Sequence, residues 1–156
     1  VGARCERKEF HIAHERMATG AAPGLLFSLA RLYPPREQQG AVVVAAPRGE
    51  RHEVGALMVA MLAALRGFAV VYMGADVPEN EIAYVAEVRI AELVLLSVIN
   101  LSRAEVRQVA RSLSAVVPAA TRIIMGGAAS ISVEGTRVEQ LPGLADLDVL
   151  LRSIAP

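Results

Sequence analysis

Glu50 and His52 are the pair of side chains in this sequence best placed to do chemistry. They follow the short apolar run 43–47 and precede a helical pattern that begins near Gly55. In an α/β unit this junction is the carboxyl end of a strand, where such folds place their ligands. A neutral imidazole can bind a metal, and a carboxylate two positions earlier can orient its ring. The pair predicts a metal-centred cofactor with His52 as its one protein ligand. The simpler alternative is that His52 is a helix-capping or surface residue.

Small residues at two other expected strand ends extend this candidate site. Ser97 lies in the third apolar run of the expected sheet, and Gly126 and Gly127 follow the fourth. In a flavodoxin-like strand order the first and third strands flank the topological switch point, so His52 and Ser97 should face one crevice. Glycines let the backbone approach a bulky ligand closely, although each could equally be a turn residue. The predicted cofactor-binding set is His52, Glu50, Gly55, Ser97, Gly126 and Gly127.

The elements that must position these residues alternate between strand and helix patterns after residue 40. This alternation predicts a five-stranded, parallel, doubly wound α/β sheet of the flavodoxin-like or cobalamin-binding-like kind. We expect a turn at 74–78, and a loop or broken helix at 128–135. The expected strands are 41–46, 69–73, 93–99, 122–125 and 138–141, and the expected helices are 53–66, 79–89, 102–117 and a final one ending at 154.

The first 35 residues have a different pattern from the remainder. Apolar residues spaced by three or four predict a helix over about 6–33, which Gly20 and Pro23 either kink or divide into two shorter helices. The polar stretch 34–40 ends it. We therefore expect an N-terminal helical segment at 1–35, the remnant of a helical cap, followed by an α/β domain at 41–156.

Composition excludes several classes of function. Sixteen basic and sixteen acidic residues cancel, so nothing indicates a nucleic-acid-binding surface. The longest apolar run, 54–65, is too short to span a membrane, and the single cysteine, Cys5, suits a reducing cytoplasm. Because no second titratable group pairs with His52 in a catalytic arrangement, independent catalysis is not expected. The start at Val1 suggests a fragment of a longer polypeptide.

The motif set resembles the cobalamin-binding domain family over about residues 41–154. The family pattern is Asp-x-His-x-x-Gly, then Ser-x-Leu, then Gly-Gly; here Glu50 replaces the Asp and Ile99 replaces the Leu. The runs 44–57 and 72–78 resemble the sensory branch of this family, typified by the CarH-type light-dependent regulators. Those proteins cap adenosylcobalamin with a helical bundle containing a Trp, which this chain lacks. His11 and His14 could supply an upper ligand, or could be solvated helix residues.

A domain of this kind without the cap is similar to the heme- or cobalamin-type sensor (SCHIC) domain of AppA-like photosynthesis antirepressors. This resemblance implies heme or cobalamin, with His52 as the axial ligand to iron or cobalt, or no cofactor at all. It also implies a cytoplasmic, light- or redox-sensing domain whose partners are a transcriptional repressor protein and other domains of its own chain, such as a blue-light flavin domain.

Three alternatives remain open from the sequence. The first is a CarH-type adenosylcobalamin photoreceptor domain. The second is the corrinoid-carrying module of a methyltransferase or mutase, in which the same histidine binds the cobalt. The third is a flavodoxin-like fold that serves only as a protein-binding surface.

Overall fold

The structure is a computed structural model. It describes residues 40–154 without a gap, residues 32–35, and isolated positions 17, 20, 21, 24, 28 and 29, which are helical. Most of the expected helix at 6–33 therefore lies outside the described residues, as do Cys5, His11 and His14. The division into a helical segment and an α/β domain stays a prediction.

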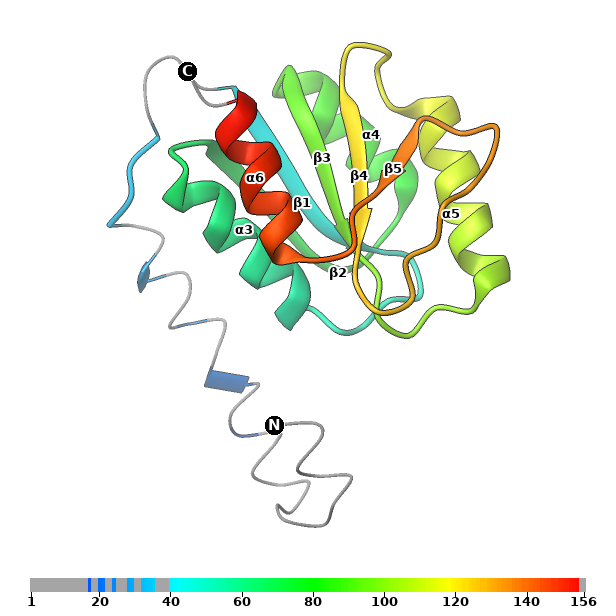
Figure 1. The fold of residues 1–156 in the computed structure, drawn as a ribbon, viewed down its shortest axis with the longest axis horizontal. Coiled ribbons are helices and arrows are strands. Elements are labelled where there is room, and N and C mark those ends of the chain that lie inside the picture. Colours follow the sequence, from blue (N-terminus) through cyan, green and yellow to red (C-terminus); the bar gives the residue numbers. More distant parts are fainter. Residues whose placement is uncertain are drawn as a thin grey trace.

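The core of the fold is a five-stranded parallel sheet (Figure 1), which confirms the expected fold class. The strand order, β2-β1-β3-β4-β5, places the topological switch point between β1 and β3. The carboxyl ends of these two central strands therefore form the edge at which a ligand is expected. The strands are β1 (Ala41–Pro47), β2 (Ala69–Val77), β3 (Ala91–Ser97), β4 (Arg122–Gly126) and β5 (Val138–Gln140).

Four helices cover the sheet, two on each face (Figure 1). They are α3 (Val54–Leu65), α4 (Glu79–Val88), α5 (Arg103–Val116) and α6 (Leu144–Ile154). Successive residues of β1 alternate between two apolar cores: Val43 and Ala45 face α4 and α5, whereas Val42 and Val44 face α3 and α6. Both faces of the sheet are buried, which explains its unbroken apolar strands. None of the described helices is long and apolar enough to cross a bilayer.

Three expected strand boundaries were wrong by two residues or more. The turn expected at 74–78 is instead the end of β2, which continues to Val77 because bulges absorb the irregular residues; the pairing with β1 shifts register after Val44 and again after Ala45. The third strand begins at Ala91, two residues early, because Glu92 interrupts the apolar pattern at another register shift. It also ends two residues early, at Ser97 rather than at 99. Residues 128–135 form a loop rather than a helix.

Arg137 ties the end of α5 to the start of β5. Its guanidinium donates to the carbonyls of Val117 at 2.6 Å and Ser114 at 3.2 Å, and to three carbonyls of the following turn at 3.4 Å. The carbonyls at and beyond the end of a helix have no N–H partners within the helix. The Arg137 guanidinium supplies the donors that they lack. Since β5 has only three residues, this side chain helps to fix the strand that leads towards α6.

We expect Arg137→Met to lower the free energy of unfolding by about 1 kcal/mol, because the aliphatic stem remains but the donors are lost. Arg107→Met, on the exposed surface of α5, should change it by less than about 0.5 kcal/mol. Urea denaturation followed by circular dichroism measures both values. Equal effects of the two substitutions would contradict the role given to Arg137.

Candidate functional site

Glu50 is a fully buried carboxylate at the carboxyl end of β1, with 0% of its surface exposed. One oxygen accepts the N–H groups of Ile99 and Asn100, each at 2.7 Å. The other accepts the backbone N–H of His52 at 2.9 Å and lies 2.7 Å from its ring Nδ1. Burial alone would raise the pKa of this carboxyl, but the N–H groups of Asn100, His52 and Ile99 outweigh burial and hold the pKa below its usual value of 4.5.

The contact with Glu50 fixes the tautomer of the His52 ring. An ionised carboxylate can only accept hydrogen bonds, so in the neutral ring Nδ1 carries the proton and the lone pair lies on Nε2. The side chain of His52 remains 55% exposed, in contrast to its buried partner. The expected carboxylate–imidazole contact is therefore present, and it leaves Nε2 in the form that binds a metal.

The loop that carries Glu50 and His52 is also held from the β2 side. Asp76 accepts the N–H of Gly49 at 2.7 Å through its carboxylate, and its own N–H donates to the Glu50 carbonyl at 2.9 Å. One residue beyond His52, Glu53 accepts the Tyr72 hydroxyl at 3.2 Å. Burial, followed by the charge of Glu53, raises the pKa of Tyr72, which keeps this hydroxyl a donor. Strands β2 and β3 thus fix the loop from opposite sides.

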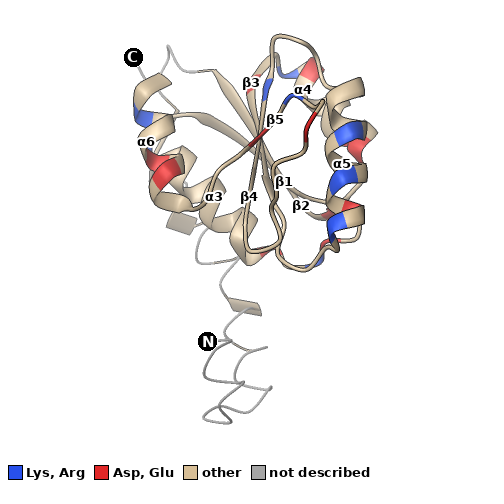
Figure 2. Ribbon diagram, turned by 45° about the vertical axis from the view of Figure 1, so that its right-hand side comes forward, with Lys and Arg blue, Asp and Glu red and all other residues tan. Residues whose placement is uncertain are grey.

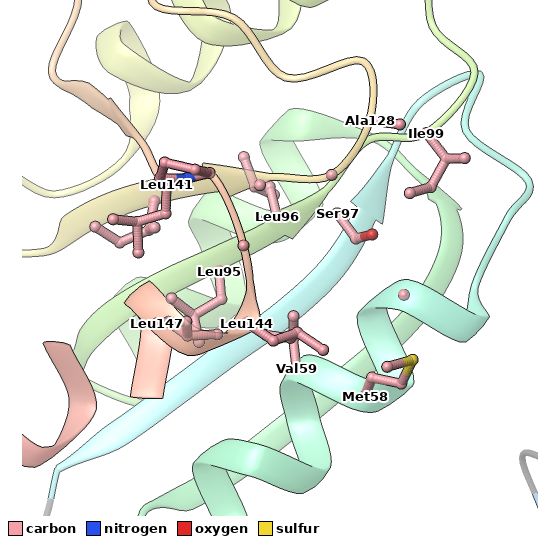
Figure 3. Close-up of a pocket in the computed structure, with 16 residues that line it drawn as sticks. Met58, Val59, Leu95, Leu96, Ser97, Ile99, Ala128, Leu141, Leu144 and Leu147 are labelled. Carbon is pink, nitrogen blue, oxygen red and sulfur yellow. The ribbon is translucent and has the colours of Figure 1, made fainter. Parts of the chain in front are cut away.

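A pocket of about 290 Å³ opens beside this loop, between α3, α6 and the ends of β3 and β4 (Figure 3). Ser97 supplies the one polar side chain among the described residues that surround it. The complete lining is Gly55, Met58, Val59, Leu95, Leu96, Ser97, Ile99, Ile124, Gly126, Gly127, Ala128, Leu141, Pro142, Gly143, Leu144 and Leu147.

The structure separates the predicted site residues into two groups. Ser97 and the three glycines line the pocket, whereas Glu50 and His52 lie on the adjoining loop and do not line it. Ser97 therefore lines the pocket and His52 adjoins it, and the expectation that both face one crevice stays a prediction. Ser97 has the same parity in β3 as Leu93 and Leu95, so it points towards α3 and α6, while the hydrogen bonds of Glu50 hold His52 on the loop.

The three glycines have unequal roles in shaping the pocket. A Cβ at Gly55 would meet the Ser97 hydroxyl, and Figure 3 shows that hydroxyl pointing towards the first turn of α3. Gly127 has φ +110°, and a Cβ there would meet the carbonyl oxygen of Val98. Beside Gly126 the nearest atom to an added Cβ is a carbonyl oxygen at 3.4 Å, an ordinary contact.

Sequence reasoning missed the apolar walls of the pocket. Met58 and Val59 follow Gly55 by three and four positions, so all three share one face of α3. That spacing was no usable signal, because apolar residues occupy every face of α3. Leu144 and Leu147 come from α6, whose position beside α3 depends on the whole sheet order.

Charged side chains lie away from this pocket. Arg103, Arg107 and Arg111 lie four positions apart along the exposed surface of α5, and Glu105 is the one acidic residue of this helix (Figure 2). This helix therefore carries a short basic row, although basic and acidic residues are equal in number over the whole sequence.

Comparison with known proteins places the chain in a family. The model of the B12 binding domain matches residues 40–148, well over half of the sequence. The chain belongs to the B12-binding domain family. No protein of curated function matches the sequence. The match supports a corrinoid as the cofactor and gives the heme alternative no support.

Solved structures share the fold of this B12-binding domain. A monomethylamine corrinoid protein from Methanosarcina barkeri has a TM-score of 0.67 and 20% identity, over 99% of this chain and 77% of that chain. A cobalamin-binding protein from Desulfitobacterium hafniense DCB-2 has a TM-score of 0.60 and 21% identity, over 97% and 75%. A chain of the methanol:cobalamin methyltransferase complex MtaBC from Methanosarcina barkeri has a TM-score of 0.63 and 19% identity, over 74% of this chain and 46% of that chain.

We expect Glu50→Gln to lower the free energy of unfolding by about 2 kcal/mol at pH 7, because an amide cannot accept all of these N–H groups. Since the folded pKa is depressed, the stabilisation is complete above pH 4.5 and is lost as the pH falls below it. Urea denaturation of the parent protein and of Glu50→Gln, at about four pH values between 3 and 7, should show that their difference in free energy of unfolding becomes smaller in acid. Glu87→Gln, at an exposed position on α4, is the matched control; a pH-independent difference would contradict the role of the Glu50 charge.

Gly127→Ala should lower the free energy of unfolding by about 2 kcal/mol or more, because a positive φ and a backbone carbonyl both oppose the new Cβ. Gly55→Ala should change it by less than about 1 kcal/mol, since the Ser97 hydroxyl can rotate away and alanine favours the helix. Thermal and urea denaturation distinguish the two variants. Comparable losses would show that Gly55 is as tightly constrained as Gly127.

Proposed function

We propose that this domain binds a corrinoid and that Nε2 of His52 would hold its cobalt. The observation that carries this proposal is the Glu50–His52 pair. A buried, ionised carboxylate holds the proton on Nδ1 and directs the lone pair of an exposed ring outwards at the ligand-binding edge of the sheet. No other residue is proposed to bind the metal.

The residues around His52 fit such a cofactor. Gly55 and Gly127 let the elements around the pocket pack closely, because a Cβ at these positions would meet the Ser97 hydroxyl and the Val98 carbonyl oxygen. The pocket of about 290 Å³ lies at the lower limit of small-ligand sites, which is room for a heterocyclic base and not for a corrin ring. A corrinoid carries such a base on its nucleotide tail, whereas heme has no tail. The pocket therefore supports a corrinoid over heme.

The chain's own residues bind and orient, and none is proposed to catalyse a reaction alone. Glu50 strengthens the imidazole as a ligand by accepting its Nδ1–H, and the backbone donors of the β3–α5 loop keep that carboxylate ionised and fixed. When bound, cobalt would supply reversible ligand binding and, in alkylated corrinoids, a labile cobalt–carbon bond. His52 would hold the metal, and the hydrogen bonds of Glu50 would keep its ring oriented.

How the bound corrinoid is used forms a second part of the proposal. The similarity to corrinoid proteins of methyltransferase systems supports a carrier module that works with a catalytic partner. The runs 44–57 and 72–78 resemble the sensory branch and support a regulatory domain that binds a transcriptional repressor. A light-dependent change in the size of the adenosylcobalamin-loaded protein, measured by chromatography in the dark and after illumination, would favour the sensory use. An unchanged size and a retained corrinoid would favour the carrier.

Hydroxocobalamin added to the purified protein should give a saturable change in the visible spectrum, and His52→Ala should weaken binding by about tenfold or more. Arg107→Ala, on the outer surface of α5, should bind as the parent does. Hemin should give no saturable change that depends on His52. In the cobalt(II) state, labelling the protein with nitrogen-15 histidine should alter the electron paramagnetic resonance splitting; an unaltered splitting would show that His52 is not the ligand.

A further inference from the structure

We infer that the pocket beside Gly55 discriminates among corrinoids by the base of the nucleotide tail, favouring an apolar benzimidazole over a purine. This inference rests on the proposed function, because it assumes that the tail enters the pocket when His52 takes its place on cobalt.

The walls of the pocket offer hydrocarbon almost everywhere. Met58 and Val59 of α3 lie opposite Leu144 and Leu147 of α6, with Leu95 and Leu141 deeper between them (Figure 3). The methyl groups of a dimethylbenzimidazole would be transferred from water into apolar surroundings on these surfaces, which is favourable in proportion to the area buried. A flat apolar base therefore suits both the shape and the chemistry of the space.

Ser97 is the sole polar side chain that lines the pocket within the described residues, and its position limits what it can recognise. It is only 4% exposed, and its hydroxyl lies beside Gly55 at one end of the pocket. One hydroxyl can satisfy one edge of a purine at most. An adenine also brings an exocyclic amine and several ring nitrogens, and those facing Met58, Val59 or the leucines of α6 would lose water without gaining a side-chain partner.

The expected discrimination follows from that loss. Burying an unpaired polar group weakens binding by a factor of about ten or more. We therefore expect hydroxocobalamin to bind about tenfold or more tightly than its adeninyl analogue. Cobinamide, which has no tail base, should also bind more weakly than hydroxocobalamin, because it leaves the apolar walls uncovered.

The test is a spectroscopic titration of the protein with hydroxocobalamin, the adeninyl analogue and cobinamide, giving three dissociation constants. Equal affinity for the benzimidazole and adenine forms would overturn the inference and leave corrinoid binding intact. Equal affinity for all three would show that the tail lies outside the pocket, which also overturns it. Failure of every corrinoid to bind would instead contradict the proposed function.

Substitutions in the pocket wall connect the selectivity to these residues. Met58→Gln adds an amide at a position that is 44% exposed and helical, so the preference for hydroxocobalamin over the adeninyl analogue should fall at least about threefold. Val88→Gln, an equally polar change on the exposed surface of α4, should leave the ratio unchanged. Val59→Thr is a near-isosteric second variant in case the first alters folding. An unchanged ratio in a folded pocket variant would overturn the assignment of selectivity to this wall.

Discussion

The carboxylate of Glu50 is the constraint on which the rest of the site depends. A charged group with no solvent exposure is costly unless its lone pairs are satisfied, and here four N–H groups from two loops converge on it. Those loops follow β1 and β3, the two strands at the topological switch point. The same set of hydrogen bonds therefore joins the two halves of the sheet edge and aligns the imidazole of His52. Stability of the edge and orientation of the ligand have one physical cause.

Around this constraint the site has two parts with different chemistry. The loop with Glu50 and His52 is polar and braced on both sides, by Asp76 from β2 and by the amides after β3. The pocket next to it is apolar and is shaped by helix packing and by two glycines. A ligand with a metal-centred ring and a separate heterocyclic arm is matched by such a pair of environments, whereas a single flat ring would use only one of them. The B12-binding family match agrees with this division.

Local patterns predicted much of this arrangement from the sequence. The strand–helix alternation fixed the number of strands, and the two-residue spacing of Glu50 and His52 was enough to expect their contact, because both lie in one loop. The donors from Ile99 and Asn100 were not predictable, since they are backbone groups from residues about 50 positions away. The walls on α3 were hidden for another reason: its sequence is apolar throughout, so periodicity could not separate the pocket side from the core side.

The alternation of side chains along β3 limits how this domain can change in length. Leu95 and Ser97 reach the pocket because they share a parity that points towards α3 and α6, while Val94 and Val98 fill the opposite core. Inserting or deleting one residue within β3 would exchange these sets, placing a hydroxyl among the helices of the other layer and removing it from the pocket. The loop at 128–135 is under no such parity rule. Natural insertions in relatives should therefore accumulate there and be excluded from the central strand.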